Sequence, residues 1–356
     1  MLPELLDPNQ NNWQMLGHEW AVNLLKGQLT NIQDGKSSIR HAYLFTGAEG
    51  VGRRTLALHF AQALNCPTPL AAGIPCLKCR TCQKIETMQH PDLAIVQAEH
   101  AGATLKVDQV RELQHSLALA PYEARYRVAL LLRFEEAHLS AANALLKSLE
   151  EPPPQVIMLL TASSAESLLP TIVSRCQVIR LRPLSWQTVQ DGLQERWKVP
   201  LEEAQTLARI SDGRPGFAYR LHQDPEALEK RKVWLDDQLE LLTARRCEKF
   251  AYAESVADFR SKNPQQKAQS NANLRNMLLT WLSFWRDVML SAAFLEGETA
   301  PIINLEYRVP IEELGQRLGL VGARHAAALV ERTLERLEHN VNTRMAIEVL
   351  LLDMPR

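Results

Sequence analysis

The chain has 356 residues, 46% of them hydrophobic, which is enough for two or three packed domains. Its 40 Lys and Arg residues are matched by 41 Asp and Glu residues, and this balance excludes a protein that coats nucleic acid through a basic excess. No apolar run approaches the roughly 20 residues of a membrane span, and residues 1–12 lack the apolar core of a signal peptide. We therefore expect a soluble, cytoplasmic protein.

The N-terminal part of the chain predicts the opening unit of a parallel α/β sheet. Apolar spacing predicts a helix over residues 13–34, followed by a short buried strand at residues 42–45. The strand ends at a glycine-rich loop, residues 47–52, and helical spacing resumes from Arg53 to Leu64. A strand, a tight loop and a helix in this order begin many α/β folds.

Further aliphatic runs predict more strands of the same sheet, at residues 93–96, 128–132 and 156–160. Continuous aliphatic runs suit parallel strands that helices cover on both faces. Helical stretches at residues 107–119 and 141–150 separate the strands. Ser140 is a suitable N-cap for the second stretch, and the prolines at residues 152–154 end it. The fold class expected is a doubly wound α/β domain.

The pattern changes after Pro183, because no convincing strand follows and helical segments dominate up to Arg356. The breaks between these segments fall at residues 213–216, 263–264 and 301. We place domain boundaries to give a sheet domain at 1–182, a small helical domain at 183–223 and a second helical domain at 224–356. Residues 261–273, rich in Gln, Asn, Ser and Lys, are expected to form an exposed loop.

One apolar stripe in the last domain is open to two interpretations. Its members recur at helical spacing and are Leu278, Trp281, Leu282, Trp285 and Met289. Such a stripe is either part of a core or a subunit interface, and the sequence does not separate the two.

Four cysteines form a tight cluster, with Cys76, Cys79 and Cys82 in a C-x2-C-x2-C pattern and Cys66 ten positions upstream. Four thiolates complete a tetrahedral zinc site and leave no open position, so the expected zinc is structural rather than catalytic. The residues around the cluster are rich in Pro and Gly, and a metal would help to order them. An iron–sulfur cluster is the main alternative, although nothing else in the sequence suggests redox chemistry.

The glycine loop matches part of the phosphate-loop consensus G-x-x-x-x-G-K-[ST]. Gly47 and Gly52 have the correct spacing, with Gly50 between them, but Arg53 and Arg54 replace the Lys and the Ser/Thr. The planar guanidinium of Arg is not equivalent to the compact ammonium of Lys, and Arg54 cannot ligate magnesium. The loop therefore predicts weak nucleotide binding or none, and no hydrolysis. A plain strand-to-helix turn is the other interpretation.

Hydrolysis also needs an acidic pair just past an aliphatic strand. The strand predicted at residues 128–132 is followed by Arg133 and Phe134, and only then by Glu135 and Glu136. We interpret these two glutamates as exposed residues that lead into a helix, without a catalytic role.

Several motifs together resemble the AAA+ clamp-loader ATPases, a family related to the small subunits of replication factor C. The matching segments are residues 41–47, 50–52, 90–92, 107–111, 143–147, 149–152, 174–176, 340–342 and 346–348. The cysteine insert directly after the first helix of the sheet domain is typical of the bacterial members. The resemblance covers nearly the whole chain, and implies a small helical lid domain and a C-terminal helical collar domain.

Ser174-Arg175-Cys176 is the most specific match, because it resembles the arginine-finger motif of that family. The resemblance implies that Arg175 reaches the ATP site of a neighbouring subunit and stabilises charge on the transferring phosphoryl group. Local sequence alone also allows a structural arginine that caps the end of a helix. Cys176 is expected to be packed rather than reactive.

Departures from the family pattern indicate a non-hydrolysing member. Alignment without gaps puts the family's Asp-Glu pair on Leu132 and Arg133, and the arginine of its second domain on Gly216. The expected function is a subunit of the heteropentameric clamp loader of DNA polymerase III, a nucleotidyltransferase, in DNA replication. Its implied partners are gamma/tau and delta subunits, the sliding clamp and primer–template DNA.

Two alternatives remain open at the level of sequence. One is an ATP-hydrolysing, gamma/tau-like subunit in which Arg53 replaces Lys and Glu135 or Glu136 replaces the acidic pair. The other, a zinc-ribbon nucleic-acid-binding module, is disfavoured by the balanced charge and the single cysteine cluster.

Overall fold

The computed structural model describes residues 13–33, 39–98, 103–256, 264–294, 302–338 and 341–355. Several sequence predictions fall outside these ranges, namely those for residues 1–12, 34, 261–263, 301 and 340. The described residues form two compact units. The first unit comprises residues 1–198 and 213–218, and the second comprises residues 199–212 and 219–356.

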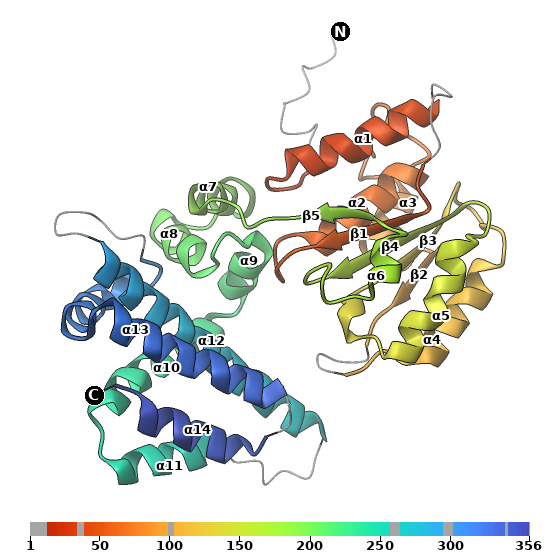
Figure 1. The fold of residues 1–356 in the computed structure, drawn as a ribbon. Helices are drawn as coiled ribbons and strands as arrows, with labels where there is room; N and C mark the ends of the chain where they lie inside the picture. Colours follow the sequence, from red (N-terminus) through yellow and green to blue (C-terminus); the bar gives the residue numbers. More distant parts are fainter. Residues whose placement is uncertain are drawn as a thin grey trace. The chain divides into compact units, whose positions relative to one another are not determined.

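A five-stranded, wholly parallel sheet forms the centre of the first unit (Figure 1). Its strand order is β2-β3-β4-β1-β5. The strands are β1 (Ala42–Thr46), β2 (Leu93–Val96), β3 (Arg127–Leu131), β4 (Val156–Ala162) and β5 (Gln177–Arg180). The predicted strands are therefore confirmed to within two residues at their ends, and the doubly wound α/β class is confirmed with them. The edge strand β5 was not predicted.

Helices cover both faces of this sheet, as Figure 1 shows. Helix α1 (Glu19–Gln33) precedes the first strand. The elements that connect the strands are α2 (Arg53–Asn65), α3 (Arg80–Glu86), α4 (Val107–Leu117), the 3-10 helix η2 (Phe134–Glu136), α5 (Leu139–Glu150) and α6 (Pro170–Val173). Alternate residues of β1 separate into two cores. Tyr43 and Phe45 pack with α1 and α2, whereas Ala42 and Leu44 pack with α4 and α5. Burial on both faces explains why the strands are aliphatic without alternation.

The start of α5 differs from the sequence prediction. The helix begins at Leu139 rather than at residue 141, and its N-cap is His138 instead of Ser140. The ring nitrogen Nδ1 of His138 accepts a hydrogen bond from the backbone N–H of Ser140 at 3.2 Å. The acceptor that caps the helix is therefore the imidazole nitrogen of His138, whereas the sequence predicted the hydroxyl oxygen of Ser140.

Within the described residues, no strand follows β5, as predicted. The later helices are α7 (Trp186–Trp197), α8 (Leu201–Ile210), α9 (Pro215–Gln223), α10 (Pro225–Thr243), α11 (Arg246–Val256), α12 (Pro264–Ala293), the 3-10 helix η3 (Leu305–Tyr307), α13 (Arg308–Glu338) and α14 (Thr343–Asp353). The loop predicted at residues 261–273 is wrong from Pro264 onward, because a proline in the first turn does not interrupt a helix and α12 begins there. None of the described helices is long and apolar enough to span a lipid bilayer.

The apolar stripe of α12 lies in the core of the second unit. Leu278, Trp281 and Trp285 are all at most 1% exposed, and Leu282 and Met289 pack against them. Trp281 stacks with Tyr252, and its indole N–H donates to the carbonyl oxygen of Trp234 at 2.7 Å. The core interpretation of the stripe is therefore confirmed.

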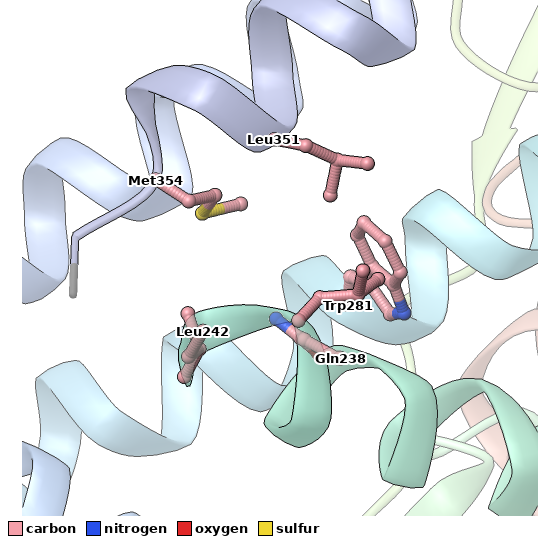
Figure 2. A pocket seen from close by; sticks show the side chains of 6 residues that line it. Gln238, Leu242, Trp281, Leu351 and Met354 are labelled. Atoms are coloured by element: carbon pink, nitrogen blue, oxygen red, sulfur yellow. The ribbon is translucent and has the colours of Figure 1, made fainter. Parts of the chain in front are cut away.

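A small cavity of about 10 Å³ interrupts this core next to Trp281. Figure 2 shows the side chains of Gln238, Leu242, Leu351 and Met354 around the same space. Gln238 is 2% exposed, and neither polar atom of its side chain has a hydrogen-bond partner among the described residues. The core therefore has a small packing defect and an unsatisfied amide side chain at this place.

Candidate functional site

The four clustered cysteines converge from three consecutive elements of the first unit. Cys66 caps the C-terminus of α2, Cys76 and Cys79 lie in the following loop, and Cys82 lies in α3. Their sulfur atoms all lie within 4.8 Å of one another. Four ligands about 2.3 Å from a central zinc ion would be separated by about 3.8 Å, so the cluster fits a tetrahedral metal site.

Backbone N–H groups also hold these sulfur atoms in place. The N–H of Cys76 donates to Cys66 Sγ at 3.4 Å, that of Cys79 to Cys76 Sγ at 3.3 Å, and that of Cys82 to Cys79 Sγ at 3.4 Å. Burial acts to raise the pKa of Cys76, but the Thr68 hydroxyl and backbone donors lower it to about 6. A thiolate is therefore available at neutral pH, as a metal ligand requires.

Two further cysteines lie apart from the cluster. Cys176 is buried, and desolvation raises the pKa of its thiol to about 12, so the packed, unreactive role predicted for it is consistent with its surroundings. Cys247 is exposed on α11.

The candidate phosphate loop connects β1 to α2. Gly47, Gly50 and Gly52 all have positive φ values, of 144°, 85° and 113°. Gly50 is also enclosed, because the backbone N–H of Gly216 donates to its carbonyl oxygen at 2.8 Å. A Cβ atom at position 50 would lie 2.8 Å from the backbone nitrogen of Phe217, so only glycine fits there. The first turn of α9 thus packs directly on the loop.

Arg53, at the position of the consensus lysine, is a buried cation. Its residue is 8% exposed, and its Nη1 lies 3.9 Å from Glu135 Oε1. Glu135 Oε1 also accepts a hydrogen bond from the backbone N–H of Ser163 at 3.0 Å. Desolvation lowers the pKa of Arg53, and the nearby Glu135 acts in the opposite direction. By contrast, Arg54 is exposed.

The prediction that Glu135 and Glu136 are exposed is wrong, because both are half-buried. Glu136 accepts a hydrogen bond from Arg133 Nε at 3.0 Å. The short 3-10 helix turns these side chains back toward the end of the sheet instead of into solvent. The sequence alone did not predict an ion pair between Arg53 and Glu135. The two residues are 82 positions apart and come together because they follow strands of the same parallel sheet.

Leu132 and Arg133 directly follow β3, the place where an acidic pair would hold magnesium and water. Leu132 is buried, and the Arg133 backbone N–H donates to Thr161 Oγ1 at 2.9 Å. No carboxylate takes the place of either residue, and Glu135, a few positions later, lies 3.9 Å from Arg53 Nη1.

Arg175 lies two residues beyond α6. Its Nη1 donates to the carbonyl oxygen of Thr171 at 2.8 Å, and its Nη2 lies 2.7 Å from Glu150 Oε1. Ser174 is the C-cap of α6, and its hydroxyl donates to the same Thr171 oxygen at 3.1 Å. The guanidinium therefore makes the helix-end contact that local sequence allows, while 35% of its side chain stays exposed.

The His90-Pro91-Asp92 motif fixes a loop that sequence analysis did not assign to it. The buried carboxylate of Asp92 accepts hydrogen bonds from the backbone N–H groups of Tyr122, Glu123 and Ala124 at 2.6, 2.9 and 2.9 Å. Burial opposes ionisation of Asp92, but these three donors outweigh it and lower its pKa. A carboxylate preceding a buried strand could have suggested such a role.

We predict that Asp92→Asn lowers the free energy of unfolding by about 2 kcal/mol at neutral pH, because a neutral amide accepts these bonds less strongly. The pKa of Asp92 is lower in the folded chain than in the unfolded chain. Its contribution is therefore complete above pH ~4 and is lost as the pH falls through the folded pKa. Urea titrations at pH 7 and pH 3 check this. An equal difference between wild type and variant at both pH values would contradict it.

With this geometry established, the chain can be compared with known proteins. A family model described as "DNA polymerase III, delta subunit" matches residues 19–185. A DNA polymerase III subunit delta' from Pseudomonas aeruginosa is 39% identical over 193 residues, which is 53% of this chain and 57% of the relative. The chain is thus similar to the delta' subunits of DNA polymerase III over its N-terminal half.

Other relatives include members of related families. The delta' subunit of Bacillus subtilis is 34% identical over 197 residues, covering 55% of this chain and 58% of the relative. The tau subunit of Escherichia coli is 34% identical over 218 residues, covering 57% of this chain and 33% of the relative. The chain thus matches a little over half the length of the delta' proteins.

Proposed function

We propose that this chain is a delta-prime-type, non-hydrolysing subunit of a DNA polymerase III clamp loader. The Arg53–Glu135 pair carries the proposal, because it supplies the phosphate loop with an internal negative charge in place of a bound phosphate. The contact between Gly216 and Gly50 supports it further, since the first turn of α9 covers the loop. Leu132 and Arg133 offer no magnesium ligand.

In this proposal, Arg175 acts on the ATP site of a neighbouring gamma/tau subunit. Water attacks the γ-phosphorus there while the bond to the ADP oxygen breaks, and the guanidinium stabilises the negative charge on the transferring group. Its present partners, Thr171 and Glu150, lie at the surface, so exchanging them for phosphate oxygens costs little. Delta, the sliding clamp and primed DNA would complete the heteropentameric assembly in the cytoplasm.

The remaining parts of the chain have supporting roles in the proposal. Cys66, Cys76, Cys79 and Cys82 would hold a structural zinc ion, which would offset half of the negative charge of four thiolates and cross-link their loop. The sheet domain would extend to residue 182, the lid over residues 183–223 and the collar over residues 224–356.

Measurements of ATP binding and hydrolysis by the purified chain test whether its own phosphate loop is inactive. We expect no turnover and no calorimetric ATP binding by the chain alone, and turnover only after gamma/tau and delta subunits, clamp and primed DNA are added. Arg53→Lys combined with Arg54→Thr restores the consensus loop and is expected to stay inactive, because magnesium ligands are still missing. Turnover by the wild-type chain alone would contradict the proposal.

The Arg53–Glu135 proximity also favours one rival function, an active ATPase with a rearranged site. In that case Glu135 would orient the attacking water. Turnover by the isolated chain that disappears in Glu135→Gln, but not in the exposed control Glu151→Gln, would establish the rival.

A further inference from the structure

The segment between α4 and β3, residues 118–126, has neither helical nor strand structure but presents two large apolar side chains. Leu119 is 63% exposed and Tyr122 is 84% exposed. Loops that display such side chains are commonly mobile. Here the backbone of the segment is instead held by side chains from several other elements, and we call it the braced loop.

Part of this bracing comes from the residue next to a cysteine ligand. Asn65 ends α2 and directly precedes Cys66. Its Nδ2 donates to the carbonyl oxygen of Tyr126 at 3.0 Å, and its Oδ1 accepts from the backbone N–H of Tyr126 at 2.9 Å. One amide side chain therefore satisfies both backbone groups of Tyr126.

A second brace comes from α3, which carries Cys82. Lys84 Nζ, two positions after this cysteine, lies 3.0 Å from Glu123 Oε1. His90 Nε2 lies 3.4 Å from the same carboxylate oxygen. Gln62 of α2 donates to the carbonyl oxygen of Cys82 at 2.8 Å, which joins α3 to the helix that carries Asn65.

The cysteine cluster determines whether these braces stay in position. Helix α3 has seven residues and buries only Cys82 and Ile85. A helix this short is unstable without tertiary support, and a metal that cross-links Cys66 and Cys82 would fix the start of α3 against the end of α2. Asp92, in contrast, directly precedes β2 and depends on the sheet.

We propose that occupancy of the Cys66–Cys76–Cys79–Cys82 metal site controls the order of the braced loop. The bound metal positions Asn65, which hydrogen-bonds to the backbone of Tyr126, and Lys84, which pairs with Glu123. Neither contact involves a residue of the sheet. Loss of the metal releases the loop from Asn65 and Lys84, while the sheet stays folded and Asp92 keeps its hydrogen bonds to residues 122–124. This inference rests on the proposed metal site but is independent of clamp loading and of the role of Arg175.

Hydrogen exchange measured by mass spectrometry tests the coupling, with metal content measured by elemental analysis. Removing the metal with a chelator is expected to accelerate exchange in peptides covering residues 118–126 by about tenfold or more, because local opening replaces global unfolding as the exchange route. Peptides covering β4 serve as the control and should keep their native rates. Restoring Zn²⁺ should reverse the change.

Substitutions in the metal-loaded chain separate bracing from general loss of structure. Lys84→Met and Asn65→Ala are expected to accelerate exchange in residues 118–126 with the metal content unchanged. Lys78→Met is the control, because it makes the same substitution at an exposed lysine between Cys76 and Cys79. It should leave the exchange rates of residues 118–126 unchanged. Native exchange of the loop after chelation, or in both brace variants, would overturn the inference. The inference would also be overturned if the chain as purified contains no metal and residues 118–126 nevertheless exchange slowly.

Discussion

In the proposed assembly, Arg175→Ala is expected to slow hydrolysis at the ATP site of the neighbouring subunit by about 10³-fold, because removing an arginine finger withdraws charge stabilisation from the transition state. The steady-state ATPase rate of the whole loader should fall by the fraction of total turnover that this one site contributes. Single-turnover measurements on a reconstituted loader, with clamp and primed DNA, resolve the affected site as a missing fast phase. Arg175→Lys should recover little activity, since an ammonium does not reproduce the planar fork.

Two controls distinguish a lost arginine finger from a general loss of structure. Arg180 is a matched control, because it is an exposed arginine of the adjoining strand that pairs with Glu166 at 3.5 Å, and Arg180→Ala should leave the rate unchanged. Stability of the Arg175→Ala chain should also stay within ~1 kcal/mol of wild type, as expected for an exposed ion pair. A normal fast phase in the Arg175→Ala loader would contradict a catalytic role for Arg175. Its function would then be structural, through the helix-end hydrogen bond to Thr171.

Trp281→Ala is expected to lower the free energy of unfolding of the second unit by about 3–5 kcal/mol. The substitution removes a side chain that is 1% exposed, breaks the hydrogen bond to Trp234 and enlarges the existing cavity beside Gln238 (Figure 2). The indole packs against residues of α10 and α14, so its removal leaves the core of the second unit with a larger void.

Urea titration followed by circular dichroism at 222 nm measures this loss. Trp281→Phe should cost less, because the ring is partly retained while the N–H donor is lost. Trp20, which is 52% exposed, provides the control, and Trp20→Ala should change stability by less than ~0.5 kcal/mol. A loss below ~1 kcal/mol for Trp281→Ala would contradict the packing of this core.

The sheet could be predicted from the sequence because its strands are buried on both faces. Continuous aliphatic runs such as Val156 to Leu160 leave little choice of structure when Gly- and Pro-rich segments bound them. The edge strand β5 was missed for the converse reason. It has four residues, begins with a polar Gln177 and ends with an exposed Arg180, so its pairing with β1 determines its structure more than its own composition does.

The candidate site was predictable only where its residues are close together in the sequence. The cysteines occur within 17 positions, and the structure brings their sulfur atoms together as their spacing predicts. The Arg53–Glu135 and Asp92–Tyr122 contacts each join residues at least 30 positions apart. Such contacts depend on strand order, which apolar periodicity does not reveal. The role of Arg175 depends on a second chain and stays a prediction.

The different environments of the six cysteines have a practical consequence for labelling. Cys176 is buried with a raised pKa, and the four clustered thiols would be occupied by the proposed metal, whereas Cys247 is exposed on α11. The folded, metal-loaded chain therefore offers one accessible thiol for a maleimide dye without removal of any native cysteine. A fluorophore attached there would sit on the second unit, away from the phosphate loop and Arg175 in sequence, and its anisotropy would report directly on assembly with partner subunits.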